Sequence, residues 1–158
     1  MPYLAWSDDL NTQIPELDAQ HRVMIDRLNG LRTALSKGST TEALTQMDAL
    51  LECLQHHFEF EEQVLQMIDF SGIADHHSGH AAILEQVRAQ RELLEGDPVH
   101  AADAVLERIT QALIEHIRHD DLDFGPTVRE WLQDASPPDD PFRKLVGDTG
   151  HVCPPATQ

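Results

Sequence analysis

The chain has 158 residues, a length that fits one domain built around a single core. Its 28 acidic and 11 basic residues give a formal net charge of −17, which repels phosphate backbones and anionic lipids. A nucleic-acid-binding or membrane-surface protein is therefore not expected. Hydrophobic residues make up 41% of the chain, too many for a disordered protein, and no apolar run approaches the roughly 20 residues of a membrane span.

The N-terminus and the cysteines bear on cellular location. The first nine residues, Met-Pro-Tyr-Leu-Ala-Trp-Ser-Asp-Asp, lack the basic stretch followed by an apolar stretch that is typical of a signal peptide. Two cysteines, Cys53 and Cys153, are too few for a disulfide framework and fit a reducing compartment. We therefore expect a cytoplasmic protein. Its unusual feature is the ten histidines beside the 28 carboxylates, because they supply many nitrogen and oxygen ligands.

Four segments have apolar residues spaced by three and four, which predicts amphipathic helices. They cover residues 17–35, 47–68, 73–94 and 102–116, and the breakers that end them are Lys37-Gly38-Ser39, Asp69-Phe70-Ser71-Gly72, Gly96-Asp97-Pro98 and Gly125-Pro126. No segment alternates with period two over a useful length, as a half-buried strand would. The fold class is therefore all-α, an antiparallel up-down-up-down four-helix bundle with a C-terminal extension.

The end of the chain differs in character, because residues 125–158 contain six prolines. A short helical candidate at 127–135 would pack on one end of the bundle, and a disordered tail is an equally good interpretation. We therefore divide the chain into a bundle, residues 1–124, and a Pro-rich C-terminal extension, residues 125–158. The apolar residues available for contacts are Val128, Trp131 and Leu132 in the helical candidate and Phe142, Leu145 and Val146 beyond it.

Histidine and glutamate stand on the apolar stripe of all four helices, where Leu or Ile is expected. A buried imidazole or carboxylate costs several kcal/mol without a partner. A single one is usually a hydrogen-bonded core residue, but six on four inward faces indicate a metal centre, because residues at i and i+4 reach the same point. The six are His21, His57, Glu61, His76, His80 and His116.

The histidine doublets can each contribute only one residue to the interior, because adjacent helical residues diverge by about 100°. The unbroken stepping selects His57 over His56 and His76 over His77. We expect the remaining histidines of the helices to be solvated or to lie next to the ligands; these are His56, His77, His100 and His119.

A seventh ligand is less clear from the spacing. Asp120 lies at i+4 from His116 and is favoured by an ideal helix. Asp121, at i+5, points about 140° away from His116 on such a helix, so it would need a local widening of the π-bulge kind. Periodicity alone does not select Asp121.

The whole constellation resembles bacterial hemerythrin, and the likeness covers residues 6–123. It rests on His21, His57-Phe-Glu-Phe-Glu61-Glu, His76-x-x-x-His80 and His116-Ile-x-x-x-Asp121, together with Trp6 and the run Leu17-Asp18-Ala19-Gln20-His21. The resemblance implies a non-heme di-iron site inside a four-helix bundle, with an oxo or hydroxo bridge between two iron ions (Fe2+/Fe3+). It also selects Asp121 as the seventh ligand in place of Asp120.

By this resemblance each ligand has a role: His76, His80 and His116 hold one iron, His21 and His57 hold the other, and Glu61 and Asp121 bridge them. The iron with two histidines keeps an open position, where a small ligand can bind. We therefore expect reversible dioxygen binding for transport, storage, delivery or sensing. An oxygen-consuming or a signalling protein encoded elsewhere would then be the partner.

Reversible oxygen binding requires a dry pocket, because water or protons would leave the metals oxidised. Leu113 lies one turn before His116 and should flank the open iron, with Phe58, Ile109 and Leu28 as neighbours, although ordinary core packing explains these residues as well. The rival hypotheses are a di-iron enzyme acting on oxygen, peroxide, nitric oxide or an organic substrate, and iron storage, which the closed ligand set disfavours.

Overall fold

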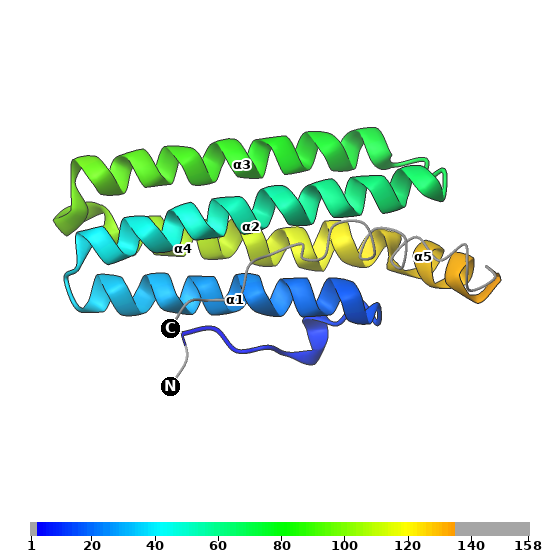
Figure 1. Ribbon diagram of the computed structural model, residues 1–158, viewed down its shortest axis with the longest axis horizontal. Helices are drawn as coiled ribbons and strands as arrows, with labels where there is room; N and C mark the ends of the chain where they lie inside the picture. The colour runs from blue at the N-terminus through cyan, green and yellow to red at the C-terminus, as the bar shows by residue number, and fades with distance from the viewer. Residues whose placement is uncertain (1–2, 135–158) are drawn as a thin grey trace.

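The computed structural model describes residues 3–134, which form helices joined by short turns. The four long helices are α1 (Pro15–Ser36), α2 (Thr40–Met67), α3 (Ile73–Gly96) and α4 (Pro98–Glu115). Each contacts the next along the chain, and α1 also contacts α4, so the four close into an antiparallel bundle (Figure 1). The predicted all-α, up-down-up-down four-helix bundle is confirmed.

The turn between α1 and α2 is closed by backbone hydrogen bonds at the end of α1. The Gly38 N–H donates to the carbonyl of Leu35 (3.0 Å), and the Ser39 N–H donates to that of Ala34 (3.1 Å). This pairing is the Schellman motif, which requires a left-handed residue after the helix, and Gly38 has φ +69°. The sequence Lys37-Gly38-Ser39 therefore ends α1 where the spacing predicts.

The interior of the bundle is apolar from this turn to the middle of the helices. Side chains from all four helices share one buried cluster, and burying each of them stabilises the fold by about 1.5–3 kcal/mol. This shared packing holds the four helices against one another. It includes Leu31, Met47, Leu54, Val87 and Leu106.

The breaker Gly125-Pro126 predicted that the fourth helix ends before Gly125. In the structure the helix continues past that residue. It widens into the π-helix η2 (His116–Asp121) and continues as α5 (Leu122–Asp134) with Pro126 inside it. A proline in a helix costs about 3 kcal/mol. Burial offsets this cost, because Phe124 and Val128 pack into a second apolar cluster with Ile14, Leu17 and Phe60.

The later part of α5 covers residues 127–134 of the short helical candidate, and α5 extends beyond the end of α3 in Figure 1. The contacts predicted for Phe142, Leu145 and Val146 lie outside the described residues. The domain division at residue 124 stays a prediction. None of the helices in residues 3–134 combines the length and the apolar character needed to cross a bilayer.

Ahead of α1, the chain runs back beside that helix (blue in Figure 1) and includes the short 3-10 helix η1 (Asp8–Leu10). η1 contacts the π-helix η2, which is more than one hundred residues later in the sequence. The N-terminal residues therefore lie next to the irregular part of the fourth helix.

We predict that Gly38→Ala lowers the free energy of unfolding by about 1 kcal/mol, because alanine is strained at positive φ. No atom lies within 4 Å of the added Cβ, so the whole effect is conformational. Urea unfolding of the two proteins measures it.

Gly96→Ala is the matched control, because its Cβ also meets nothing within 4 Å and its φ is not positive. We expect this change to be neutral or to stabilise by up to about 1 kcal/mol. Equal losses in the two variants would show that Gly38 is not held by its backbone conformation.

Candidate metal centre

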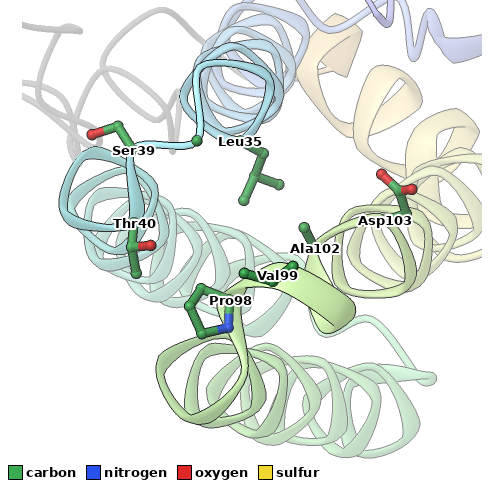
Figure 2. A pocket seen from close by; sticks show the side chains of 8 residues that line it. Leu35, Ser39, Thr40, Pro98, Val99, Ala102 and Asp103 are labelled. Atoms are coloured by element: carbon green, nitrogen blue, oxygen red, sulfur yellow. The ribbon is translucent and has the colours of Figure 1, made fainter.

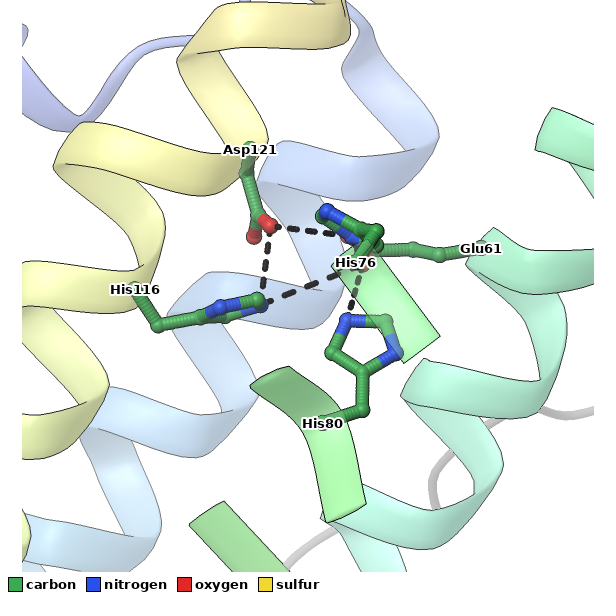
Figure 3. Close-up of side chains that lie close together, drawn as sticks. All are labelled: Glu61, His76, His80, His116 and Asp121. Atoms are coloured by element: carbon green, nitrogen blue, oxygen red, sulfur yellow. Dashed lines mark hydrogen bonds and ion pairs between the residues drawn. The ribbon is translucent and has the colours of Figure 1, made fainter. Parts of the chain in front are cut away.

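All seven side chains expected from the sequence lie together inside the bundle, away from the α1–α2 turn. None of them is more than 8% exposed, and they come from α1, α2, α3 and η2. Figure 3 shows five of them, from α2, α3 and η2, pointing toward one another. The seven are His21, His57, Glu61, His76, His80, His116 and Asp121.

These residues form two groups that share their carboxylates. One group joins His76, His80 and His116 to Glu61 and Asp121, and the other joins His21 and His57 to the same two carboxylates. Within each group the nearest ligand atoms all lie within 4.8 Å of one another. The division into three and two histidines is the one that the resemblance implies.

Glu61 directs a different oxygen to each group. Its Oε1 lies 3.0 Å from Nε2 of His57, whereas its Oε2 lies 3.1 Å from Nε2 of His76 and 3.2 Å from Nε2 of His80. A carboxylate placed in this way can bridge two cations.

Asp121 repeats this arrangement from η2. Its Oδ2 lies 2.8 Å from Nε2 of His21, and its Oδ1 lies 2.8 Å from Nε2 of His116. Asp121 reaches the interior because the helix is widened over His116–Asp121, which is the distortion that its i+5 spacing requires. It is completely buried.

Buried polar atoms without hydrogen bonds test whether cations fit here. Nε2 of His21, Nε2 of His57 and Nε2 of His80 make no aligned hydrogen bond, although a carboxylate oxygen lies 2.8–3.2 Å from each of them. Oε1 of Glu61 and both carboxylate oxygens of Asp121 likewise lack an aligned hydrogen bond. Leaving a buried polar group unsatisfied costs about 1–3 kcal/mol. One cation held by each group would satisfy these atoms, and nitrogen and oxygen donors suit iron among other first-row metals.

The electrostatics keep both carboxylates ionised. Burial by itself raises the pKa of Glu61, but the neighbouring imidazoles, His57 first, hold it well below its usual value. Burial and the charge of Glu61 raise the pKa of Asp121. The effects of His116 and His21 are larger and opposite, so the pKa of Asp121 lies below its usual value. Burial lowers the pKa of His21, and the two carboxylates overcome this and raise it to about 9. Ionised carboxylates are the form that binds metal.

Two further residues hold the outer nitrogens of the imidazoles, a role that was not predicted for either from the sequence. Nδ1 of His57 lies 2.6 Å from Oε1 of Gln20, and Nδ1 of His80 lies 2.8 Å from Oε1 of Glu62. Such partners fix the ring so that Nε2 faces inward. Their one signal in the sequence is position, because Gln20 precedes His21 and Glu62 follows Glu61.

The other histidines within residues 3–134 lie outside the cluster. His56, His77, His100 and His119 are exposed, as expected, and His77 also contacts Glu62 through its Nδ1 at 2.7 Å.

The four residues expected around an oxygen pocket lie together in the apolar cluster beside the centre. The ring of Phe58 stacks on that of His80, with centroids 3.9 Å apart, and meets the ring of His116 edge-on at 5.3 Å. Leu28, Ile109 and Leu113 belong to the same cluster as Phe58 and are at most 2% exposed. This side of the centre is therefore dry, and its use as an oxygen pocket stays a prediction.

A separate cavity of about 330 Å³ lies between the α1–α2 turn and the start of α4 (Figure 2). Its lining includes Leu35, Ser39, Pro98, Val99 and Ala102. None of the seven clustered residues lines it, so it is unrelated to the candidate centre.

The fold and the site together define a class, a four-helix bundle that binds cations through buried histidines and carboxylates. The sequence profile of the hemerythrin HHE cation binding domain matches residues 12–128. The chain belongs to the hemerythrin family.

Relatives in several bacteria agree with this assignment. The chain is 29% identical over 133 residues to a bacteriohemerythrin of Stenotrophomonas maltophilia, covering 84% of this chain and 86% of the relative. It is 28% identical over 136 residues to one of Pseudomonas aeruginosa, covering 85% and 87%. It is 23% identical over 129 residues to one of Methylococcus capsulatus, covering 81% and 98%.

Asp121→Asn should reduce the number of metal ions bound below the two that the paired groups suggest, because one shared negative charge is lost. Elemental analysis after anaerobic loading with Fe2+ measures the content. Asp123→Asn is the control, since Asp123 is exposed two residues later, and it should bind as the unmodified protein does. Full metal content in Asp121→Asn would exclude Asp121 as a shared ligand.

Proposed function

We propose that the protein binds dioxygen reversibly at a pair of iron ions held by the seven clustered residues. The unequal division of histidines between two groups that share both carboxylates is the observation that carries this proposal. Bound iron would supply the electrons and the coordination position that dioxygen needs. The names of the bacteriohemerythrin relatives support the same conclusion.

The two groups differ in the number of protein nitrogens they offer. His76, His80 and His116 would hold one ion, while only His21 and His57 would hold the other, and each ion would also receive one oxygen from Glu61 and one from Asp121. The group with two histidines offers one protein nitrogen fewer, so an ion held there would keep a position for a small molecule.

The protein would contribute a dry and rigid surrounding. Phe58, stacked on His80, and the buried Leu113 keep water from the centre, while Gln20 and Glu62 hold the imidazoles in orientation. Water exclusion favours release of oxygen unchanged over its reduction. Oxygen is thus the small ligand of the proposal, and a cytoplasmic location and a protein partner stay predictions.

A di-iron enzyme is the alternative function. The feature that would favour it, a C-terminal tail folded over the open side, lies outside the described residues. The enzyme is therefore an outcome of the test and not a second proposal.

Oxygen cycling of the anaerobically reduced, iron-loaded protein tests the proposal. We expect an absorption band that appears with oxygen, disappears on degassing and returns over repeated cycles, with about two irons per chain by elemental analysis. Loss of the band with turnover of an added substrate would instead identify an enzyme. Many irons per chain would identify a storage protein.

Leu113→Asp should accelerate autoxidation of the oxygenated protein by more than about tenfold, because a buried carboxylate brings water and protons to the centre. The decay of the absorption band in air measures the rate.

Leu106→Asp is the control for Leu113→Asp, since Leu106 is also buried on α4 but lies two turns farther from His116. It should destabilise the fold without comparable acceleration. Equal rates in the two variants would remove Leu113 from the pocket.

A further inference from the structure

We propose that the N-terminal strap, defined as residues 4–12, supports the π-helix η2 from outside. It thereby positions Asp121 in the cation cluster, the name used here for the seven clustered residues of the candidate metal centre. The inference rests on the cation-binding part of the proposed function and does not require oxygen binding. It assigns a positioning role to Asp9 and Leu10, which precede Asp121 by more than one hundred residues in the sequence.

The π-helix needs such support because its geometry is uncommon and is less favourable than that of an α-helix. If η2 relaxed to a regular α-helix, Asp121 would point about 140° away from His116. The bridging carboxylate would then leave the cluster. Whatever stabilises the wide turn therefore stabilises the placement of Asp121.

Two pairs of η2 side chains point in different directions, and the strap contacts one pair. His116 and Asp121 face the cluster, whereas Ile117 and Arg118 face the strap. Ile117 is only 2% exposed, because it packs in a small apolar cluster with Leu10 of the strap, which is 1% exposed. Ile25, Ile114, Leu4 and Trp6 complete that cluster.

A polar contact between η2 and the strap accompanies this apolar packing. Nε of Arg118 donates to Oδ2 of Asp9 at 2.7 Å, and the hydroxyl of Ser7 donates to the other oxygen of the same carboxylate. The Arg118–Asp9 pair is about half exposed, so it contributes less than the buried apolar contact. Together the two contacts hold successive residues of the wide turn, Ile117 and Arg118.

The strap can act as a support because it is anchored on both sides of Leu10. The backbone of Leu4 pairs with the amide of Asn29, at 2.9 Å and 2.8 Å. Thr12 donates to the buried carboxylate of Asp18 through its N–H at 2.9 Å and its hydroxyl at 2.7 Å. Arg129 of α5 donates to the carbonyl of Thr12 at 2.6 Å, which links the strap to the helix that follows η2.

Zinc release from the full chain tests the inference without oxygen chemistry. Zn2+ suits the same nitrogen and oxygen donors, and its transfer to a coloured chelator gives a rate. We expect Leu10→Ala to accelerate release about tenfold, the size typical of losing a residue that orients ligands. The rate is compared under conditions in which every variant is fully folded by circular dichroism.

Leu94→Ala is the matched control, because Leu94 is 0% exposed and lies at the far end of α3 from the cluster. It removes the same side chain from the core without touching the strap, and its release rate should be that of the unmodified protein. Equal rates for Leu10→Ala and Leu94→Ala would overturn the proposal, because the strap would then act through global stability alone.

A charge exchange tests the polar contact. Asp9→Arg and Arg118→Asp should each accelerate zinc release about twofold, and the double variant should restore the original rate, since it re-forms the pair with reversed charges. A double variant that releases zinc as fast as the single variants would overturn the role of this pair.

Hydrogen exchange of the metal-free protein gives an independent readout. Amides of residues 117–122 should exchange faster in Leu10→Ala than in Leu94→Ala, and identical exchange would overturn the proposal. Failure of the oxygen test with the expected zinc and exchange results would refute oxygen binding and leave the support by the strap established.

Discussion

Two buried carboxylates, Glu61 and Asp121, impose the constraint on which the rest of the structure depends. Both are at most 1% exposed, and an unpaired charge in such a position costs several kcal/mol unless the group is neutralised. Each places one oxygen beside the three-histidine group and the other beside the two-histidine group. Four buried oxygens need imidazole partners from every side of the bundle. The helices must therefore bring their histidines to the same level along the bundle axis. The apolar cluster toward the α1–α2 turn supplies the stability that allows this polar interior.

The constraint also explains where the backbone departs from regular geometry. The helix that carries His116 must turn Asp121 inward as well, and only the wide turn of η2 achieves both. Regular structure resumes in α5 despite Pro126, because Phe124 and Val128 bury themselves beside Phe60. The irregular segment thus lies between a packed helix behind it, the cation cluster on its inner side and the N-terminal strap on its outer side. The uncommon geometry of η2 is thus held by the residues around it.

Sequence periodicity was sufficient for the bundle and for most of the cluster. His57, Glu61, His76 and His80 interrupt apolar stripes whose spacing alone shows which way they face. Asp121 could not be predicted from the spacing, because a π-helix changes the direction in which a side chain points and has no local sequence signature. Only the resemblance selected Asp121. Continuation of the fourth helix through Pro126 was missed because its stabilisation comes from residues far away in the chain. The roles of Gln20 and Glu62 were missed because hydrogen bonds between helices depend on the axial register of the helices, which the spacing within one helix does not give.

The two groups differ not only in their number of histidines but also in the residues that accept hydrogen bonds from the Nδ1 atoms of those histidines. In the three-histidine group His80 is held by the carboxylate of Glu62, whereas in the two-histidine group His57 is held by the neutral amide of Gln20. A carboxylate makes the imidazole it holds a stronger donor than an amide does. An ion held by the group with three histidines would therefore also have a more strongly donating ligand, and one held by the group with two would be the more electron-poor. Under the proposed function, the group with two histidines is the one that an additional small ligand would complete.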